Sequence, residues 1–228
     1  MNESVLILIF FIAGLLALYL FIQCYYTAQK RRDGIFLLAI RLSFEYSEFD
    51  PFDIPNAYAG FDWLSKGSER RIDYVFYGQL GNYDVKAFDY QYVTGSGKDR
   101  HKVKFSAVVF DTGLYFKSLL IRPESILDRV AGAMGFEDID FESEEFSRAY
   151  YIKSPDKKFA YDIIYPQMME YLLKYQGWSL SMLGRSIMVY TGNTFSPEEF
   201  ERAISFGQGY LDLLPNYLRE KSQITENM

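Results

Sequence analysis

The sequence predicts an α+β fold: an N-terminal transmembrane helix followed by an antiparallel-sheet domain with helices packed on one face. Three observations predict it. Residues 4–29 carry no charged side chain. Runs typical of strands follow one another between residues 72 and 110, which argues against a parallel sheet whose strands alternate with long helices. Apolar stripes at helical spacing and a strong helix-start signal occupy the C-terminal half.

The apolar stretch Val5–Tyr26 has the length of a membrane span. As a helix it would be about 33 Å long, enough to cross a hydrocarbon core of about 30 Å. Between Val5 and Ile22 there are 14 residues of Leu, Ile, Phe or Val. At roughly −0.4 kcal/mol each, their insertion is favoured by about 6 kcal/mol. We therefore expect residues 1–29 to form a transmembrane anchor.

Two other interpretations of this stretch are weaker. A cleaved signal peptide has a basic start and a small-residue cleavage site, whereas this chain begins Met1-Asn2-Glu3-Ser4 and has bulky residues after the span. A buried core helix rarely runs this far without a polar face.

Basic residues on one flank predict the orientation. Lys30, Arg31 and Arg32 follow the span directly, while the N-terminal side carries only Glu3 and the terminal amine. The positive-inside rule then places the N-terminus outside the cell membrane and the C-terminal domain in the cytoplasm. We expect these three basic residues to lie beside anionic lipid.

Residues 30–60 are expected to form a basic juxtamembrane helix and an irregular linker. Ile35, Leu38 and Leu42 recur at helical spacing, and Pro51 and Pro55 interrupt any later pattern. The short helix could lie on the membrane surface or be the first helix of the domain. Residues 61–228 are expected to form the α+β soluble domain, ending in a C-terminal helix.

Composition excludes several classes of protein. The chain has 228 residues with a net charge of −6, which disfavours binding to nucleic acid. The 20 Tyr and 20 Phe favour a packed body over a disordered tail. Cys24 is the only cysteine and His101 the only histidine. One chain therefore has no disulfide framework and no multi-histidine metal site.

Three runs predict the strands of the sheet: Ile72–Leu80, Val85–Val93 and His101–Phe110. Opposing Tyr92 to Val103 and Phe88 to Ala107 puts the apolar residues of the last two runs on one side. The sequence therefore predicts a hairpin whose loop is residues 94–100.

The loop of that hairpin contains Gly97-Lys98 but is no phosphate-binding loop. The motif needs a Gly where Tyr92 stands and a Ser or Thr where Asp99 stands, and a strand follows instead of a helix. The loop is either a flexible tip or a surface that contacts an anion or a partner. The candidate contact residues are Lys98, Arg100, His101 and Lys102.

This hairpin also carries a resemblance. The run Phe88-Asp89-Tyr90-x-Tyr92-x-Thr94-Gly95-Ser96-Gly97-Lys98-x-Arg100-His101 resembles a signature of uncharacterised membrane-anchored bacterial and archaeal proteins. The stretches Ile121–Glu124, Asp138–Phe146 and Phe159–Glu170 fit it too, so that it covers about residues 72–175. The pattern is similar to a membrane-associated domain of unknown function. The resemblance implies a tethered domain and brings no known activity.

The C-terminal half predicts further elements. Leu119–Ile121 is expected to be a strand, Glu124–Met134 a helix, and Asp138–Glu142 a strand with three carboxylates on one face. Those carboxylates could bind Ca²⁺ or face solvent, but the turn of a calcium loop is missing, so we expect no metal. Ser154-Pro155 is expected to start a helix that Pro166 kinks or restarts.

Two last elements complete the domain. Residues 178–190 are expected to form a hairpin around Gly184. Ser196-Pro197-Glu198-Glu199 is a full capping box and opens a last helix, which we expect to be interrupted near Gly207–Gly209.

Motifs for catalysis are missing. No Gly-x-Ser-x-Gly turn accompanies His101, and the acidic residues Asp89, Asp111, Asp162 and Glu170 have no spacing that selects a pair. We therefore expect a membrane-tethered cytoplasmic binding or scaffolding module without catalytic activity or cofactor. Its partners would be the lipid bilayer and another membrane or cytoplasmic protein. The alternatives are a domain that recognises anionic lipid or a small ligand, and an unrecognised membrane-associated hydrolase.

Overall fold

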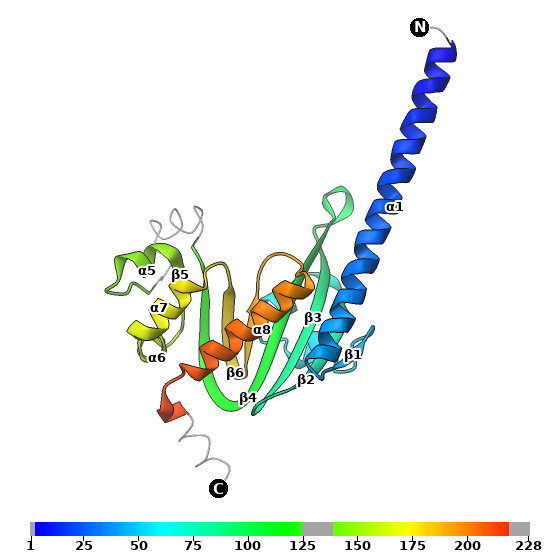
Figure 1. Ribbon diagram of the computed structural model, residues 1–228. Coiled ribbons are helices and arrows are strands. Elements are labelled where there is room, and N and C mark those ends of the chain that lie inside the picture. The colour runs from blue at the N-terminus through cyan, green and yellow to red at the C-terminus, as the bar shows by residue number, and fades with distance from the viewer. Residues whose placement is uncertain (1–2, 125–138, 219–228) are drawn as a thin grey trace.

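A computed structural model gives the structure of the protein and describes residues 3–124 and 139–218. It has an N-terminal helix, an antiparallel sheet and further helices (Figure 1). The elements are α1 (Glu3–Arg41), β1 (Glu45–Ser47), α2 (Ile54–Ala57), α3 (Asp62–Ser65), β2 (Ser68–Leu80), β3 (Tyr83–Thr94), η1 (Gly97–Asp99), β4 (His101–Pro123), α5 (Glu144–Ala149), β5 (Tyr150–Lys153), α6 (Lys157–Ile163), α7 (Pro166–Lys174), β6 (Ser179–Tyr190) and α8 (Pro197–Asp212).

The sheet is antiparallel and is organised around the long strand β4. Its first half pairs with β3, its last residues pair with β5, and β6 runs along its other edge. Strands β2 and β1 extend the sheet beyond β3. The register between β4 and β6 shifts on both sides of Phe116, where β4 bends, so the run Leu119–Ile121 continues β4 instead of forming a separate strand.

The β3–β4 hairpin has the register that the sequence predicts. Tyr92 opposes Val103 and Phe88 opposes Ala107. Phe88, Tyr90, Phe105 and Ala107 lie together in one apolar cluster, which the segment containing α2 and α3 covers. Alternation along paired strands was therefore enough to fix both the pairing and the buried face.

The other face of the sheet carries the larger core. Here α1, α6, α7 and α8 pack against side chains such as Phe76, Val108 and Phe110. The long helices thus share one face, while only the short α2 and α3 lie on the opposite face. The predicted fold class, an apolar N-terminal helix followed by an antiparallel sheet with helices on it, is confirmed.

Two expectations about glycines are wrong. The chain does not turn back at Gly184: β6 is one strand, paired along β4, and Gly184 sits at an irregularity of the register with φ 58°. Helix α8 runs from Pro197 to Asp212 and so continues through Gly207. A Cβ atom at this position would lie 2.2 Å from the ring of Phe110. That glycine permits a close helix–sheet contact and does not end the helix.

Other expectations shift or fall outside the described residues. Residues 139–142 are irregular and form no strand. Helix α6 begins at Lys157, and Asp156 caps it by accepting from the Phe159 N–H at 2.9 Å, so Ser154-Pro155 precedes the helix instead of starting it. Pro166 does start α7, and the capping box at Ser196 is present. The expected helix Glu124–Met134 lies almost wholly outside the described residues.

Candidate functional site

Helix α1 has two halves in different surroundings. From residue 9 to residue 28 every side chain is exposed, including large apolar ones such as Phe10 (73% exposed) and Phe21 (69%). The stretch Ile9–Arg41 has a window of mean hydropathy 2.0, so it is long and apolar enough to cross a membrane. An exposed apolar surface on all sides of a helix needs a nonpolar environment or a partner.

The C-terminal half of α1 belongs to the domain. Ile35, Leu38 and Ala39 are at most 2% exposed and pack with Phe44 and Phe76 in the main core. The helix is continuous from Glu3 to Arg41, so it passes residue 29 without a break. A single rigid element therefore joins the exposed apolar segment to the core of the sheet.

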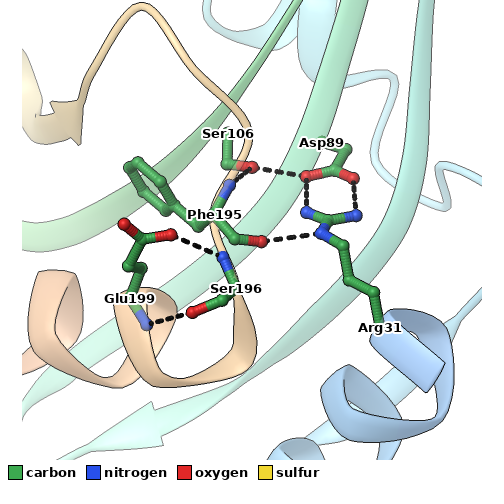
Figure 2. A network of polar contacts seen from close by, with 6 residues as sticks. All are labelled: Arg31, Asp89, Ser106, Phe195, Ser196 and Glu199. Carbon is green, nitrogen blue, oxygen red and sulfur yellow. Dashed lines mark hydrogen bonds and ion pairs between the residues drawn. The ribbon is translucent and has the colours of Figure 1, made fainter. Parts of the chain in front are cut away.

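Arg31 fixes α1 to the sheet from the side (Figure 2). Its guanidinium makes a bidentate pair with Asp89 of β3, with Nη1 2.6 Å from Oδ2 and Nη2 2.9 Å from Oδ1. Its Nε donates to the carbonyl oxygen of Phe195 at 2.7 Å. The planar fork of an arginine suits this bidentate geometry, which a lysine could not reproduce.

The same network continues to the start of α8. The hydroxyl of Ser106, opposite Asp89 on β4, donates to Asp89 at 2.5 Å and accepts from the Phe195 N–H at 2.8 Å. The next residue, Ser196, is the N-cap of α8 and exchanges hydrogen bonds with Glu199, as Figure 2 shows. We call Arg31, Asp89, Ser106 and Phe195 the helix clamp. It joins α1, both strands of the hairpin and the start of α8.

The polar side chains of the helix clamp are largely removed from water. The side chain of Asp89 is 11% exposed and that of Arg31 24%, while Ser106 is fully buried. A carboxylate removed from water to this extent must have its charge paired and its oxygens bonded. Both conditions hold, since Asp89 accepts three hydrogen bonds from Arg31 and Ser106.

The two other basic residues after the apolar stretch lie differently. Lys30 is exposed, and Arg32 makes surface contacts, 3.5 Å to Glu48 and 4.0 Å to Asp33. Of the three residues predicted to flank a membrane, Arg31 thus points into the domain. Its partner Asp89 lies on the face of β3 that also carries Val85 and Ala87 of the main core, and no pattern in the sequence links it to Arg31.

The hairpin tip carries the other predicted residues. Lys98, Arg100, His101 and Lys102 are all exposed, and Arg100 pairs with Glu69. In Figure 1 the tip projects from the sheet on the side towards which the N-terminal half of α1 extends. These four residues are close neighbours at the tip of the hairpin. Within the described residues, none of them takes part in the helix clamp.

A second carboxylate network lies on the opposite face of the sheet. Asp111 accepts from the Lys86 ammonium at 2.6 Å and from the hydroxyls of Tyr58 and Ser186 at 2.5 Å each. Burial and the hydrogen bond to Asp111 both raise the pKa of Tyr58. We call these four residues the sheet anchor, because they join the segment around α2 to β3, β4 and β6.

The candidate acids and bases do not converge on a reaction centre in the described part of the chain. Asp89 and Asp111 have all their strong contacts within the two networks, Asp162 and Glu170 are exposed, and so is His101. In residues 3–124 and 139–218 no group of three His, Cys, Asp or Glu side chains could hold a metal ion. What the arrangement can do is fix one helix rigidly to a sheet.

Comparison with known proteins adds one structural likeness. No protein-family model and no curated protein matches the chain. The fold is similar to the crystal structure of the mycobacterial trehalose monomycolate transport factor A, TtfA, with a TM-score of 0.54. The match covers 82% of this chain and 95% of that chain at 12% sequence identity, so it concerns the fold.

Proposed function

We propose that this protein is a membrane-anchored scaffolding or transport-associated module without catalytic activity. The exposed apolar half of α1 spans the bilayer, with the N-terminus outside, and the sheet domain lies in the cytoplasm. The observation that carries the proposal is the continuity of α1, whose one half has no cover while its other half belongs to the core.

The anchor and the domain would form one rigid body. A flexible linker would let a tethered domain reach in all directions, but Arg31 and the buried face of α1 leave it one orientation relative to the helix. Tethering raises the effective concentration of the domain near other membrane proteins, and a fixed orientation determines which of its surfaces they meet. TtfA, whose fold is similar, is by its title a transport factor, which agrees with a role beside a transport system.

Cell fractionation with a protease test examines the anchor. We expect the full chain in the membrane pellet after an alkaline wash, and we expect protease added outside intact cells to leave the sheet domain undigested. A tag at the N-terminus should be removed under the same conditions. Recovery of the chain in the soluble fraction, or digestion of the domain from outside, would contradict the proposal.

Catalysis is tested separately. A broad screen of hydrolase substrates on the purified full chain should give no turnover above that of the Asp111→Asn and His101→Ala variants. Turnover that either variant abolishes would replace the scaffold by an enzyme.

A second candidate function is recognition of anionic lipid by the hairpin tip. Starting at Asp89, which Arg31 holds beside α1, five residues of strand lead to Thr94 and can rise about 17 Å. Eleven residues of helix rise as far, so Thr94, at the base of the tip, reaches at most the level of about residue 20 of α1. Lys98, Lys102 and Lys30 would then lie near the headgroups, where each basic residue contributes about 1 kcal/mol.

An environment-sensitive dye at the tip tests this candidate. The full chain carries the substitutions Cys24→Ser and Ser96→Cys and is placed in nanodiscs with or without anionic lipid. We expect a blue shift of the dye only with anionic lipid, and loss of that shift in high salt and in the Lys98→Ala/Lys102→Ala variant. The control variant Lys157→Ala/Lys158→Ala removes the same charge from α6 and should keep the shift. Equal dye spectra in both nanodiscs would exclude the tip as a lipid contact.

A further inference from the structure

A hollow of about 560 Å³ opens on the face of the sheet that carries the long helices. The end of α7, the loop that follows it and the middle of α8 form its walls. We call it the α7–α8 hollow. Its volume lies within the range typical of small-molecule sites. None of its lining residues belongs to α1 or to the hairpin tip, so the hollow is separate from the membrane anchor.

The aromatic wall of the hollow is fixed by tertiary contacts. The Tyr171 hydroxyl donates to the carbonyl oxygen of Phe206 at 2.8 Å, and the two rings stack with their centroids 5.6 Å apart. The ring of Trp178 also stacks on that of Phe206, at 6.1 Å. Gly209 permits this packing, because a Cβ atom there would lie 2.4 Å from the Tyr171 hydroxyl. The wall is therefore held rigidly between the two helices.

Two aromatic side chains offer ring surface that a ligand can reach. Tyr175 is 40% exposed, and its ring lies 4.8 Å from that of Tyr171. Trp178 is half-buried. Gly177 between them has φ 98°, a backbone conformation that favours glycine, so the chain turns sharply between the two rings. A flat ligand ring gains contact area by stacking on such surfaces.

Two cations border the hollow, and each comes from a different helix. Lys174 lies at the end of α7 and Arg202 on α8, and both are exposed. The contact between Arg202 and the Glu199 carboxylate is 3.7 Å long, which is too far for a strong hydrogen bond. Lys174 makes no ion pair with any described residue, and its ammonium lies 5.1 Å from the centre of the Tyr175 ring. Both cations are therefore available to an anion.

The one acid of the lining already has a structural role. Glu199 belongs to the capping box of α8, where its Oε2 accepts from the Ser196 N–H at 2.8 Å. Two cations thus stand against one occupied carboxylate. Gln176 and Ser205, which are exposed, add neutral donors, and their side chains have no hydrogen-bond partner among the described residues. The polar groups of the lining fit a ligand that carries negative charge.

We propose that the α7–α8 hollow binds a small organic oxyanion whose flat ring lies against Tyr175 and Trp178 and whose charged head pairs with Arg202 and Lys174. The head is a carboxylate or a phosphate monoester, which share the required charge and acceptor oxygens. Both cations and Tyr175 are exposed, and Trp178 is half-buried, so the ligand meets accessible groups throughout.

Titration calorimetry on the full chain in nanodiscs of zwitterionic lipid measures the binding. The probes are phenyl phosphate, phenylacetate, inorganic phosphate and benzyl alcohol. We expect saturable binding of phenyl phosphate or phenylacetate, and the tighter of the two identifies the preferred head. Inorganic phosphate, which lacks the ring, and benzyl alcohol, which lacks the charge, should bind at least about tenfold more weakly. High salt should weaken the binding of the ringed anion.

Variants at exposed positions locate the binding without disturbing the core. Lys174→Ala/Arg202→Ala should weaken binding of the preferred probe by about tenfold. Arg202→Lys, which keeps the charge but loses the planar fork, should weaken it less. Tyr175→Ala should weaken binding of the ringed anion and leave that of inorganic phosphate unchanged. The matched control Lys153→Ala/Arg185→Ala removes two exposed cations outside the hollow and should leave the affinity unchanged.

Three results would contradict the proposal. The first is that neither ringed anion binds saturably, and the second is that benzyl alcohol binds as tightly as the anions. The third is an affinity that Lys174→Ala/Arg202→Ala leaves unchanged or that the control variant lowers as much. Each of these results would leave the anchoring of α1 untouched, because fractionation tests that separately.

Discussion

The helix clamp and the sheet anchor are similar in chemistry but join different parts of the molecule. Each has one aspartate of a sheet strand, one cation and one serine from a neighbouring strand. In the clamp the cation is Arg31, which lies 58 residues before Asp89 and on another element. In the anchor the cation is Lys86, which lies on β3 next to the strand of Asp111.

The difference shows which network fixes the orientation of α1 relative to the sheet. The sheet anchor reinforces strands that backbone hydrogen bonds already pair. The helix clamp joins α1 and the start of α8 to a sheet with which they form no ladder, so its side chains, together with the buried apolar face of α1, set the position of that helix. The aspartate of the clamp is also the drier of the two: the side chain of Asp89 is 11% exposed and that of Asp111 27%, while the cation of the clamp, Arg31, is 24% exposed and Lys86 15%. The clamp should therefore be the more sensitive to substitution.

The largest expected effect is that of Arg31→Met. The substitution leaves Asp89 charged and nearly buried, which should lower the free energy of unfolding by about 3 kcal/mol. Urea denaturation of the full chain in a mild detergent, followed by tryptophan fluorescence, measures it. Arg32→Met removes an exposed cation of the next residue and should change the free energy by less than about 0.5 kcal/mol. Equal losses for the two substitutions would show that the helix clamp contributes no more to stability than an exposed cation does.

Lys86→Met tests the sheet anchor in the same way. Asp111 keeps two hydroxyl donors and more contact with water, so we expect a loss of about 2 kcal/mol, smaller than for Arg31→Met. The same urea titration compares them. A loss larger than that of Arg31→Met would reverse the proposed ranking of the two networks.

The two serines sharpen the comparison. Ser106→Ala should cost about 1.5 kcal/mol, because it leaves the buried N–H of Phe195 without an acceptor and removes one donor from Asp89. Ser186→Ala removes a single bond to Asp111 and should cost about 1 kcal/mol. A double-mutant cycle of Ser106→Ala with Arg31→Met should show coupling, while one with Lys86→Met should be additive.

Alkaline pH should affect the sheet anchor through Tyr58. Its folded pKa is raised above the ordinary 10.0, so the proton is held more tightly in the folded than in the unfolded state. The resulting stability is present below pH 10.0 and declines as the pH rises above it. Tyr58→Phe should cost about 1 kcal/mol at neutral pH, and the difference from the wild type should shrink above that pH. A difference that stays constant would contradict the assigned role of Tyr58.

Local patterns account for the parts of the fold that could be predicted. Alternation in residues 85–110 gave the hairpin register, and the Ser196 box gave the start of α8. The predicted turn at Gly184 and the predicted break at Gly207 are wrong because glycine also occurs at register irregularities within a strand and at close contacts between a helix and a sheet. At Gly207 the ring of Phe110 occupies the space that a Cβ atom would need, and the residues next to Gly207 in the sequence do not indicate this tertiary contact.

The site was harder to predict than the fold. A basic run after an apolar span predicts contact with lipid, and that pattern gives Arg31 no reason to differ from Lys30 and Arg32. Its partner Asp89 lies on a strand 58 residues further along the chain, so only the packing of α1 on the sheet reveals the pair.

The distance between spin labels on α1 and on the hairpin tip tests the rigid connection most directly. Cys24 is exposed on α1 and takes one label, and Ser96→Cys at the tip takes the other. Pulsed electron resonance on the full chain in nanodiscs should give a single narrow distance distribution, which Arg31→Met broadens and Arg32→Met does not. A broad distribution in the chain with Arg31 intact would mean that the domain swings freely on its helix, and the rigid anchor would be refuted.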